Sequence, residues 1–449
     1  MDTSIQSLAR YAHQLRFEDL PADVVHEAKR RFIDTIGCAI GGYDAEPSRI
    51  ARALASRYNG VPSARIFGSL AASSLEHAAF ANGVALRYLD FNDAYLTRSS
   101  GHPSDTLAAV CAVGEATHAS GQAVIAAAAA AYETFCNFTD VLERERGWDQ
   151  VLHGVVATAV ASAKLLGLDE RGIAEAIALA IVPNLPLEQT RAGELSMWKG
   201  CAAANASRNG VFAALLAQLG MQGPTEAIEG RWGLRHAVGP FAWAPFGGKG
   251  GPFRIARSMI KPYPAVIHSQ SPASVAMVLR EQVRIEEIAA MTIHTYWVAN
   301  RYTDRAAPLW QPGTRETADH SIPYVVAAAL LDGSVTDASF DAAHLRDSRM
   351  RTLMAATTVQ EDAHYSRAYP ERWACRIEVE TKDGRKHTAA VEHFKGHPDN
   401  PMSDGELEDK FRALASPRLD GASCDALLAR LWALEQAVDI GDVIALLRW

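Results

Sequence analysis

The first half of the chain contains one helical pattern after another. After Pro21, a natural first-turn residue, apolar side chains recur at helical spacing until Gly41 and Gly42 end the pattern. Further helical patterns follow at 74–90, 105–118, 121–143, 154–165, 171–180 and 201–219. Many of them carry small residues, especially alanine, on more than one side, which is typical of helices packed in the middle of a domain. The pattern predicts an all-α first half.

The pattern changes near residue 270. Apolar and polar residues then alternate as they do in β-strands, at 292–297, 375–380 and 387–391. Asp383 and Gly384 form a typical hairpin turn before the last of these segments. Helical patterns return between and after the strands, at 318–331, 342–354, 404–414 and 424–434. This mixture predicts a smaller α+β domain.

The chain length also favours two domains. A chain of 449 residues exceeds what one hydrophobic core usually serves. We therefore predict a mainly α fold with a large all-helical domain at 1–269, completed by 402–449, and a smaller α+β domain at 270–401.

The charge balance argues against a nucleic-acid partner. The chain has 44 Lys and Arg against 52 Asp and Glu, a net charge of −8, so no global positive field would attract nucleic acid. An anionic substrate would therefore need a local basic pocket.

No segment predicts a membrane partner or an oxidising compartment. The N-terminal residues have no signal-peptide pattern, and the apolar run at 126–131 is too short to cross a bilayer. The six cysteines have no Cys-x-x-Cys spacing, which argues against disulfide frameworks, zinc ribbons and iron–sulfur clusters. We expect a cytoplasmic protein.

Several common catalytic motifs are absent from the sequence. There is no Walker A motif, no nucleophile elbow and no His-Glu-x-x-His pattern, and the glycines at 247–251 have the wrong spacing for phosphate binding by a P-loop. Chemistry would therefore depend on ordinary acids and bases.

The first candidate segment is LDFNDAY followed by GHPSD. Asp90 and Asp93 leave the end of one predicted helix, and His102 comes just before the next. A helix N-terminus favours the neutral form of a histidine, so His102 could accept a proton, with Asp93 or Asp90 orienting it. The alternative is a capped loop with solvated aspartates.

Two further segments place lysines at ordered points. Lys199 follows Trp198, whose ring could partly desolvate the amine and make it a usable acid or a carboxylate clamp. Lys261 and His268 flank paired prolines, which would deliver their side chains to fixed places. The alternatives are a surface lysine in the first case and a chain crossing between domains in the second.

The remaining candidates are histidines near helix starts. His320 lies in TRETADHSIPY, where polar residues run into an apolar helix, and His153 precedes a helix of small residues. Either histidine could be purely structural, because a single histidine more often is.

These segments together resemble the MmgE/PrpD family. The resemblance is carried by LDFNDAYLTRSSGHPSD, GELSMWKGCAAANASRNGVFAA, IKPYPAVIHSQSPA, TRETADHSIPYVVAAALLDG and FKGHPDNPMSDGELEDKF, which span nearly the whole chain. It implies a large helical domain completed by the C-terminal segment, a smaller α+β domain and a homodimer. It also implies activity on small polycarboxylates without a metal or an organic cofactor.

The resemblance is strongest to the 2-methylcitrate dehydratase branch. Six positions match residues of the family motifs, namely Asp90, Asp93, His102, His153, Lys199 and Lys261. There are departures as well. Ala94 stands where the dehydratase form has threonine, and Val266 stands where decarboxylases of the family have histidine.

The resemblance implies a reversible dehydration of a hydroxy polycarboxylate such as 2-methylcitrate. His102, oriented by Asp93, would remove a proton next to a carboxylate, and Lys199 or His153 would protonate the departing hydroxyl. The expected substrate-binding residues are Asp90, Lys261, His268, Arg315 and His320. The alternatives are a decarboxylase or epimerase of the cis-aconitate or iminodisuccinate type, and a catalytically lapsed dimer that binds polycarboxylates.

Overall fold

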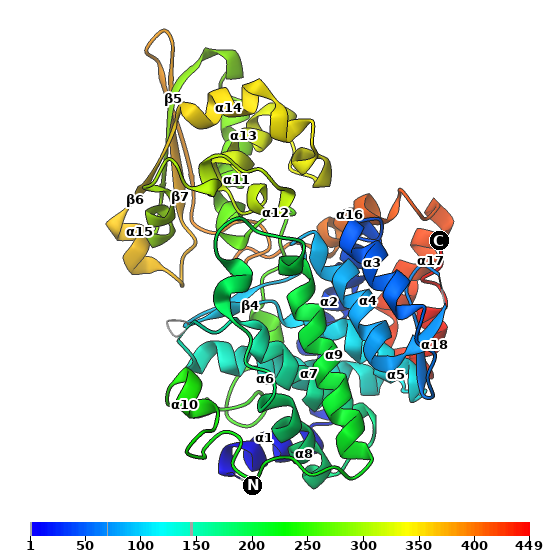
Figure 1. Cartoon of the computed structure of the whole chain (residues 1–449). Coiled ribbons are helices and arrows are strands. Elements are labelled where there is room, and N and C mark those ends of the chain that lie inside the picture. Colours follow the sequence, from blue (N-terminus) through cyan, green and yellow to red (C-terminus); the bar gives the residue numbers. More distant parts are fainter. Residues whose placement is uncertain (1, 70, 144–146) are drawn as a thin grey trace. The chain divides into compact units, whose positions relative to one another are not determined.

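The computed structural model describes residues 2–69, 71–143 and 147–449 of the chain (Figure 1). The chain divides into two compact units. The first contains Met1–Thr190, Gly200–Ile260 and Ser403–Trp449, and the second contains Arg191–Lys199 and Lys261–Met402. We propose that these units correspond to the two predicted domains, with Arg191–Lys199 joining the smaller one.

The first unit consists mainly of α-helices. Its long helices are α1 (Thr3–Gln14), α2 (Ala22–Gly41), α3 (Glu46–Ala55), α4 (Leu75–Tyr88), α5 (Leu107–Ala116), α6 (Gly121–Val141), α7 (Val151–Leu165), α8 (Glu170–Ile181), α9 (Trp198–Gln218), α16 (Asp404–Ala415) and α17 (Gly421–Trp432). The short helices α10 (Leu234–Val238) and α18 (Ile440–Ile444) complete this set. Two short antiparallel ribbons accompany them, β1 (Ser63–Arg65) with β2 (Ala72–Ser74), and β3 (Tyr95–Leu96) with β4 (Ser100–Gly101).

Helix α6 runs through the core of this unit. Its alanine run, Ala126–Ala131, is buried on every side of the helix, and α7 packs along it. Small side chains let neighbouring helix backbones approach closely, which explains why alanine appears on more than one side of the sequence pattern. The predicted mainly α fold is confirmed.

The C-terminal segment returns to the first unit by packing α16 against α2. A Cβ atom on Gly41 would lie only 2.6 Å from the Leu414 side chain, so a larger residue here would require that side chain to move. Nearby, the Lys410 ammonium donates to the buried Asp34 carboxylate at 2.5 Å. The contact joins helices that are far apart in the sequence.

The second unit is built on a four-stranded sheet with the order β6-β5-β7-β8. Its strands are β5 (Ile288–Thr295), β6 (Thr357–Glu361), β7 (Cys375–Thr381) and β8 (Lys386–Val391). Its helices are α11 (Gln270–Arg280), α12 (Arg315–Ala318), α13 (Ile322–Asp332), α14 (Ser348–Ala355) and α15 (Ala363–Ala368). Helix α11 packs against β7, β8 and α13 (Figure 1).

The strand patterns agree with the sheet. Cys375, Ile377 and Val379 of β7 are buried, and Gly384 takes the left-handed conformation, φ +84°, in the turn to β8. Strand β6, which pairs in parallel with β5, was not predicted, because its short polar sequence shows little apolar alternation. The smaller α+β region is confirmed.

One predicted helix is interrupted. The pattern at 318–331 splits into α12 and α13, and the residues between them include Asp319 and His320. Ser321 caps α13 by accepting a hydrogen bond from the Tyr324 amide at 3.2 Å. Asp319 and His320 therefore lie between the two helices and belong to neither of them.

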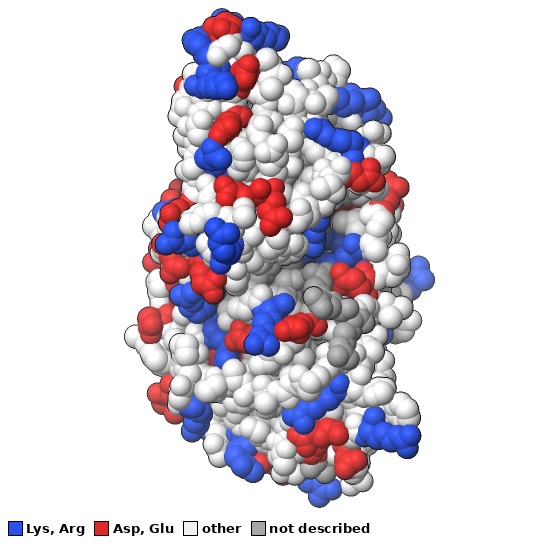
Figure 2. All heavy atoms as spheres, turned by 90° about the vertical axis from the view of Figure 1, so that its left-hand side faces the viewer, with Lys and Arg blue, Asp and Glu red and all other residues white. Residues whose placement is uncertain are grey.

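Among the described residues, none of the helices combines the length and the apolar character needed to cross a bilayer. Figure 2 shows one face of the molecule, where Lys and Arg side chains are interspersed with Asp and Glu instead of gathering in one field.

Candidate active site

The sharp turn after α4 positions the first candidate residues. The helix ends at Tyr88, and Asp90 then adopts φ +50°, a left-handed conformation that aspartate tolerates better than most residues. The β3–β4 ribbon brings the chain back to His102, which precedes the 3₁₀ helix Pro103–Thr106. At the end of β4, a Cβ atom on Gly101 would lie 2.4 Å from the buried Phe135 ring, so a larger residue here would require that ring to move.

His102 is held in a defined tautomer. Its Nδ1 lies 2.7 Å from the main-chain carbonyl oxygen of Asp93, an atom that can only accept a hydrogen bond. Nδ1 therefore carries the proton, and in the neutral ring Nε2 is the basic nitrogen. The Nε2 atom is 3.9 Å from Oδ1 of Asp90, and the His102 side chain is 10% exposed. The arrangement suits a general base.

The Asp93 carboxylate has a different task. One oxygen accepts the Ser104 amide hydrogen bond at 3.0 Å, and the other accepts the Tyr132 hydroxyl at 2.8 Å. Burial first, and then the negative charge of Asp93, raises the pKa of Tyr132 well above its ordinary value, so the phenol stays a donor. Asp93 therefore orients His102 through its main chain, while its carboxylate anchors the turn.

Arg87 is a buried partner that sequence reasoning missed. It is 1% exposed, donates to Asp90 at 2.6 Å, and its Nε lies 3.6 Å from Asp105. Asn92 donates to the same Asp105 carboxylate at 2.8 Å. The spacing of Arg87 and Asp90, three residues apart at a helix end, is the signal that could have predicted this pair.

His153 lies among aromatic rings. It lies in α7 beside Phe135, Phe138 and Trp148, with ring centroids 5.3 to 5.7 Å away. Its Nδ1 is 3.3 Å from the Thr139 hydroxyl. The imidazole of His153 is therefore packed in a largely apolar environment.

In the second unit, a lysine, an arginine and a histidine gather around Asp319. Its carboxylate lies 3.8 Å from Lys199 Nζ, is bound by Arg315 at 2.9 Å, and contacts His320 Nδ1. Burial would raise the pKa of Asp319, but Lys199, His320 and Arg315 together lower it below its ordinary value. Asp319 was not predicted, although its place four residues after Arg315 could have indicated the pair.

The three candidate segments of the second unit meet through main-chain contacts. The Leu195 amide donates to the Thr317 hydroxyl at 3.3 Å, and the Val266 amide donates to the Asp319 carbonyl at 2.8 Å. The segments that carry Lys199 and Lys261 are therefore both bonded to the one that carries Asp319. Lys261 itself is fully buried.

His268 lies in an aromatic pocket of the same unit. Its Nδ1 is 2.7 Å from the Tyr296 hydroxyl, and its ring stacks on Trp373 at 5.7 Å between centroids. Burial raises the pKa of Tyr296 well above its ordinary value, so this hydroxyl stays protonated. The imidazole is thus fixed beside a neutral donor.

The predicted residues therefore fall into two sets. The first unit brings together Asp90, Asp93 and His102, and the second brings together Lys199, Arg315 and His320. In the first set, one carboxylate, that of Asp90, lies 3.9 Å from the basic nitrogen of His102. The second surrounds one carboxylate with cations.

Comparisons with known proteins cover nearly the whole chain. It is 27% identical to cis-aconitate decarboxylase of Homo sapiens, over 99% of this chain and 94% of that protein. It is 30% identical to 2-methylcitrate dehydratase of Cupriavidus necator, over 91% of this chain and 89% of the relative. Identity to 2-methylcitrate dehydratase of Escherichia coli strain K12 is 31%, over 85% and 83% respectively.

Family comparisons match both parts of the chain. Residues 6–241 match the MmgE/PrpD N-terminal domain, and residues 263–434 match the MmgE/PrpD C-terminal domain. The resemblance inferred from the motifs is confirmed, and the chain belongs to the MmgE/PrpD family.

Proposed function

We propose that this protein is a lyase that reversibly dehydrates a small hydroxy polycarboxylate such as 2-methylcitrate. The observation that carries the proposal is the fixed tautomer of His102, whose Nδ1–H donates to the Asp93 carbonyl at 2.7 Å and whose Nε2 is basic. A base of this kind is what proton removal next to a carboxylate requires. The dehydratase relatives, at 30% and 31% identity, support the same reaction.

The proposed step begins at the carbon next to a substrate carboxylate. His102 Nε2 takes the proton from this carbon, and the released electron pair forms the new carbon–carbon double bond. The neighbouring carbon–oxygen bond breaks, and the hydroxyl leaves as water with a proton from Lys199. Asp90, 3.9 Å from Nε2, stabilises the imidazolium that forms.

We assign the acid to Lys199 instead of His153. Lys199 is 2% exposed and lies 3.8 Å from Asp319, whose pKa is lowered, and this ion pair fixes the position of the ammonium group. His153 lies among aromatic rings, and its Nδ1 faces the Thr139 hydroxyl.

The substrate carboxylates would be held by the cations of the second unit. A tricarboxylate needs local positive charge in a protein whose net charge is −8. Arg315 and Lys261 supply it, with His320 and His268 as further donors. Preorganised cations of this kind also stabilise the negative charge that develops as the proton leaves.

The test is a substrate panel given to the purified, chelator-treated protein. 2-Methylcitrate, citrate and cis-aconitate are followed by ultraviolet absorbance for a conjugated double bond and by mass spectrometry. Loss of water from 2-methylcitrate or citrate is the expected result. Turnover of none of the hydroxy acids, in either direction, would contradict the proposal.

A decarboxylase is the second candidate. The similarity to human cis-aconitate decarboxylase extends over 99% of this chain, which favours this alternative over an unrelated activity. Release of carbon dioxide from cis-aconitate without any hydration would establish it and exclude the dehydratase.

We also propose that the protein is a homodimer, as the family resemblance implies. Size-exclusion chromatography with light scattering measures the mass directly. A single species near twice the chain mass of 48.5 kDa is expected, and a monomer would contradict it.

A further inference from the structure

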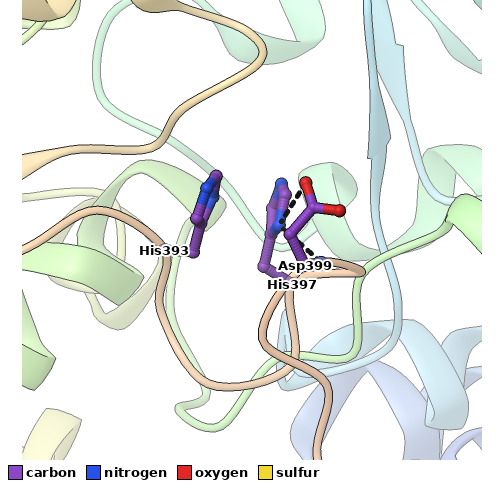
Figure 3. Close-up of side chains that lie close together, drawn as sticks. All are labelled: His393, His397 and Asp399. Carbon is purple, nitrogen blue, oxygen red and sulfur yellow. Dashed lines mark hydrogen bonds and ion pairs between the residues drawn. The ribbon is translucent and has the colours of Figure 1, made fainter.

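The loop that follows β8 contains a second group of ionisable side chains. His393, His397 and Asp399 lie close together there, and none has a role in the proposed reaction (Figure 3). The figure shows the two imidazole rings side by side, with Asp399 on the far side of His397.

This loop is held in shape by its own hydrogen bonds. The Gly396 amide donates to the Asn400 carbonyl at 2.8 Å, and the Asn400 amide donates to the His397 carbonyl at 2.9 Å. The Asn400 side chain donates to the His393 carbonyl at 3.0 Å, while Phe394 is fully buried. The backbone therefore presents both histidines from a fixed frame.

The side-chain geometry is close to that of a metal site. The two imidazole centroids are 4.3 Å apart, with 23° between the ring planes, and His397 Nδ1 lies 3.6 Å from Asp399 Oδ2. One ligand atom from each of the three residues lies within 4.8 Å of the others. Metal bonds of about 2.1 Å in a tetrahedral site place ligand atoms about 3.4 Å apart. Because the two rings are stacked, rotation of one imidazole about its side-chain bonds would be needed to bring the ligand atoms to this separation.

An unsatisfied nitrogen gives independent support. Nδ1 of His393 is buried and has no hydrogen-bond partner among the residues that the structure describes. Burying a polar nitrogen without a partner costs free energy, and a metal ion bound by the ring would offset that cost.

We propose that His393, His397 and Asp399 form a binding site for a divalent transition-metal ion such as Zn²⁺. Two imidazoles and one carboxylate suit zinc, with water completing the coordination, whereas Mg²⁺ and Ca²⁺ prefer a set of oxygen ligands. The site goes beyond the proposed reaction and does not depend on it.

Isothermal titration calorimetry of the full-length, metal-stripped protein tests the site. Zn²⁺ is titrated into the wild type and into His393→Ala, His397→Ala and Asp399→Asn, and Co²⁺ absorption reports the coordination. We expect one zinc ion per chain, with affinity reduced roughly tenfold or more in each variant. His364→Ala, which changes an exposed histidine of the same unit, is the matched control and should bind as the wild type does.

The six cysteines are all buried, so they should not compete for the ion. Circular dichroism checks that each variant is folded. Asp399 is exposed, so Asp399→Asn keeps the test valid if a histidine variant does not fold. Absence of zinc binding to the wild type would overturn the proposal. So would unchanged affinity in any of the three variants, which would mean an adventitious ion only.

Discussion

Asp34 in the first unit and Asp319 in the second are both buried aspartates beside cations, yet their pKa values shift in opposite directions. Burial raises the pKa of Asp34, and its contact with Lys410 at 2.5 Å offsets only part of that effect. For Asp319, burial acts in the same direction, but the charges of Lys199, His320 and Arg315 outweigh it and lower the pKa.

The charged groups that accompany the candidate residues differ between the two units. Around His102, the carboxylates of Asp90, Asp93 and Asp105 are close together, and the charge of Asp93 adds to the raised pKa of Asp34. The second unit has the opposite balance, with several cations facing one carboxylate. Negative surroundings stabilise a histidine that gains a proton, and positive surroundings bind an anionic substrate.

The largest expected effect is the loss of kcat when His102, the proposed general base, is replaced. His102→Ala should lower kcat by roughly 10²- to 10⁴-fold, the usual contribution of a general base. Steady-state kinetics on the substrate that the panel identifies measures it. His236→Ala, an exposed histidine of the same unit, should retain wild-type kcat.

If the folded His102→Ala protein turned over at nearly the wild-type rate, His102 would not be the base. The carboxylates of Asp90 and Asp93 near His102 would then have a structural role only, and the charge difference between the two units would not explain catalysis.

The second largest expected effect is a loss of stability when Asp319 is replaced. Asp319→Ala leaves Lys199, Arg315 and His320 without their shared buried partner, so the free energy of unfolding should fall by about 3–5 kcal/mol. Urea denaturation followed by circular dichroism measures it.

The matched control removes the other carboxylate that Arg315 binds. The Asp337 side chain is 58% exposed and lies 2.9 Å from Arg315, so Asp337→Ala should cost about 1 kcal/mol or less. Equal losses in both variants would show that burial of Asp319 does not determine the stability of this cluster.

A smaller loss of stability is expected when the Tyr132 hydroxyl, which donates to Asp93, is removed. Tyr132→Phe deletes a hydrogen bond of 2.8 Å to a charged group and should cost about 1.5–3 kcal/mol of stability. The value of kcat should change less than tenfold, roughly, because His102 is oriented by the main-chain carbonyl of Asp93. A fall in kcat as large as that of His102→Ala would instead assign the Asp93 carboxylate to proton transfer.

The sequence was most informative where the contacts are local. Asp90, Asp93 and His102 come from one short segment, and a turn between two helices was enough to predict that they meet. The way in which Asp93 orients His102 could not be predicted from the sequence. Whether a residue orients a ring with its carboxylate or with its carbonyl depends on backbone angles, which the residue type does not determine.

Long-range contacts were predicted less well. Lys199 and Asp319 are 3.8 Å apart in space but distant in sequence, so no spacing rule could pair them. Strand β6 was missed for a local reason, because its short polar sequence shows little apolar alternation, and its pairing with β5 could not be predicted either. The family resemblance identified Asp90 and Lys199 as functional positions, but it did not identify their charged partners, Arg87 and Asp319.

The smallest effect tests the opposite pKa shifts directly, through the pH dependence of stability. A carboxyl whose pKa is raised in the folded state, such as Asp34, contributes stability below the ordinary value near 3.8 and loses it as pH rises through the folded pKa. A carboxyl whose pKa is lowered, such as Asp319, contributes stability above 3.8 and loses it as pH falls through the folded pKa. Thermal melting of wild type, Asp34→Asn and Asp319→Asn from about pH 3 to pH 7 should therefore give difference curves of opposite slope, each at most about 1.4 kcal/mol per pH unit. Slopes of the same sign would mean that the cations around Asp319 do not outweigh its burial, and the contrast between the two units would fail.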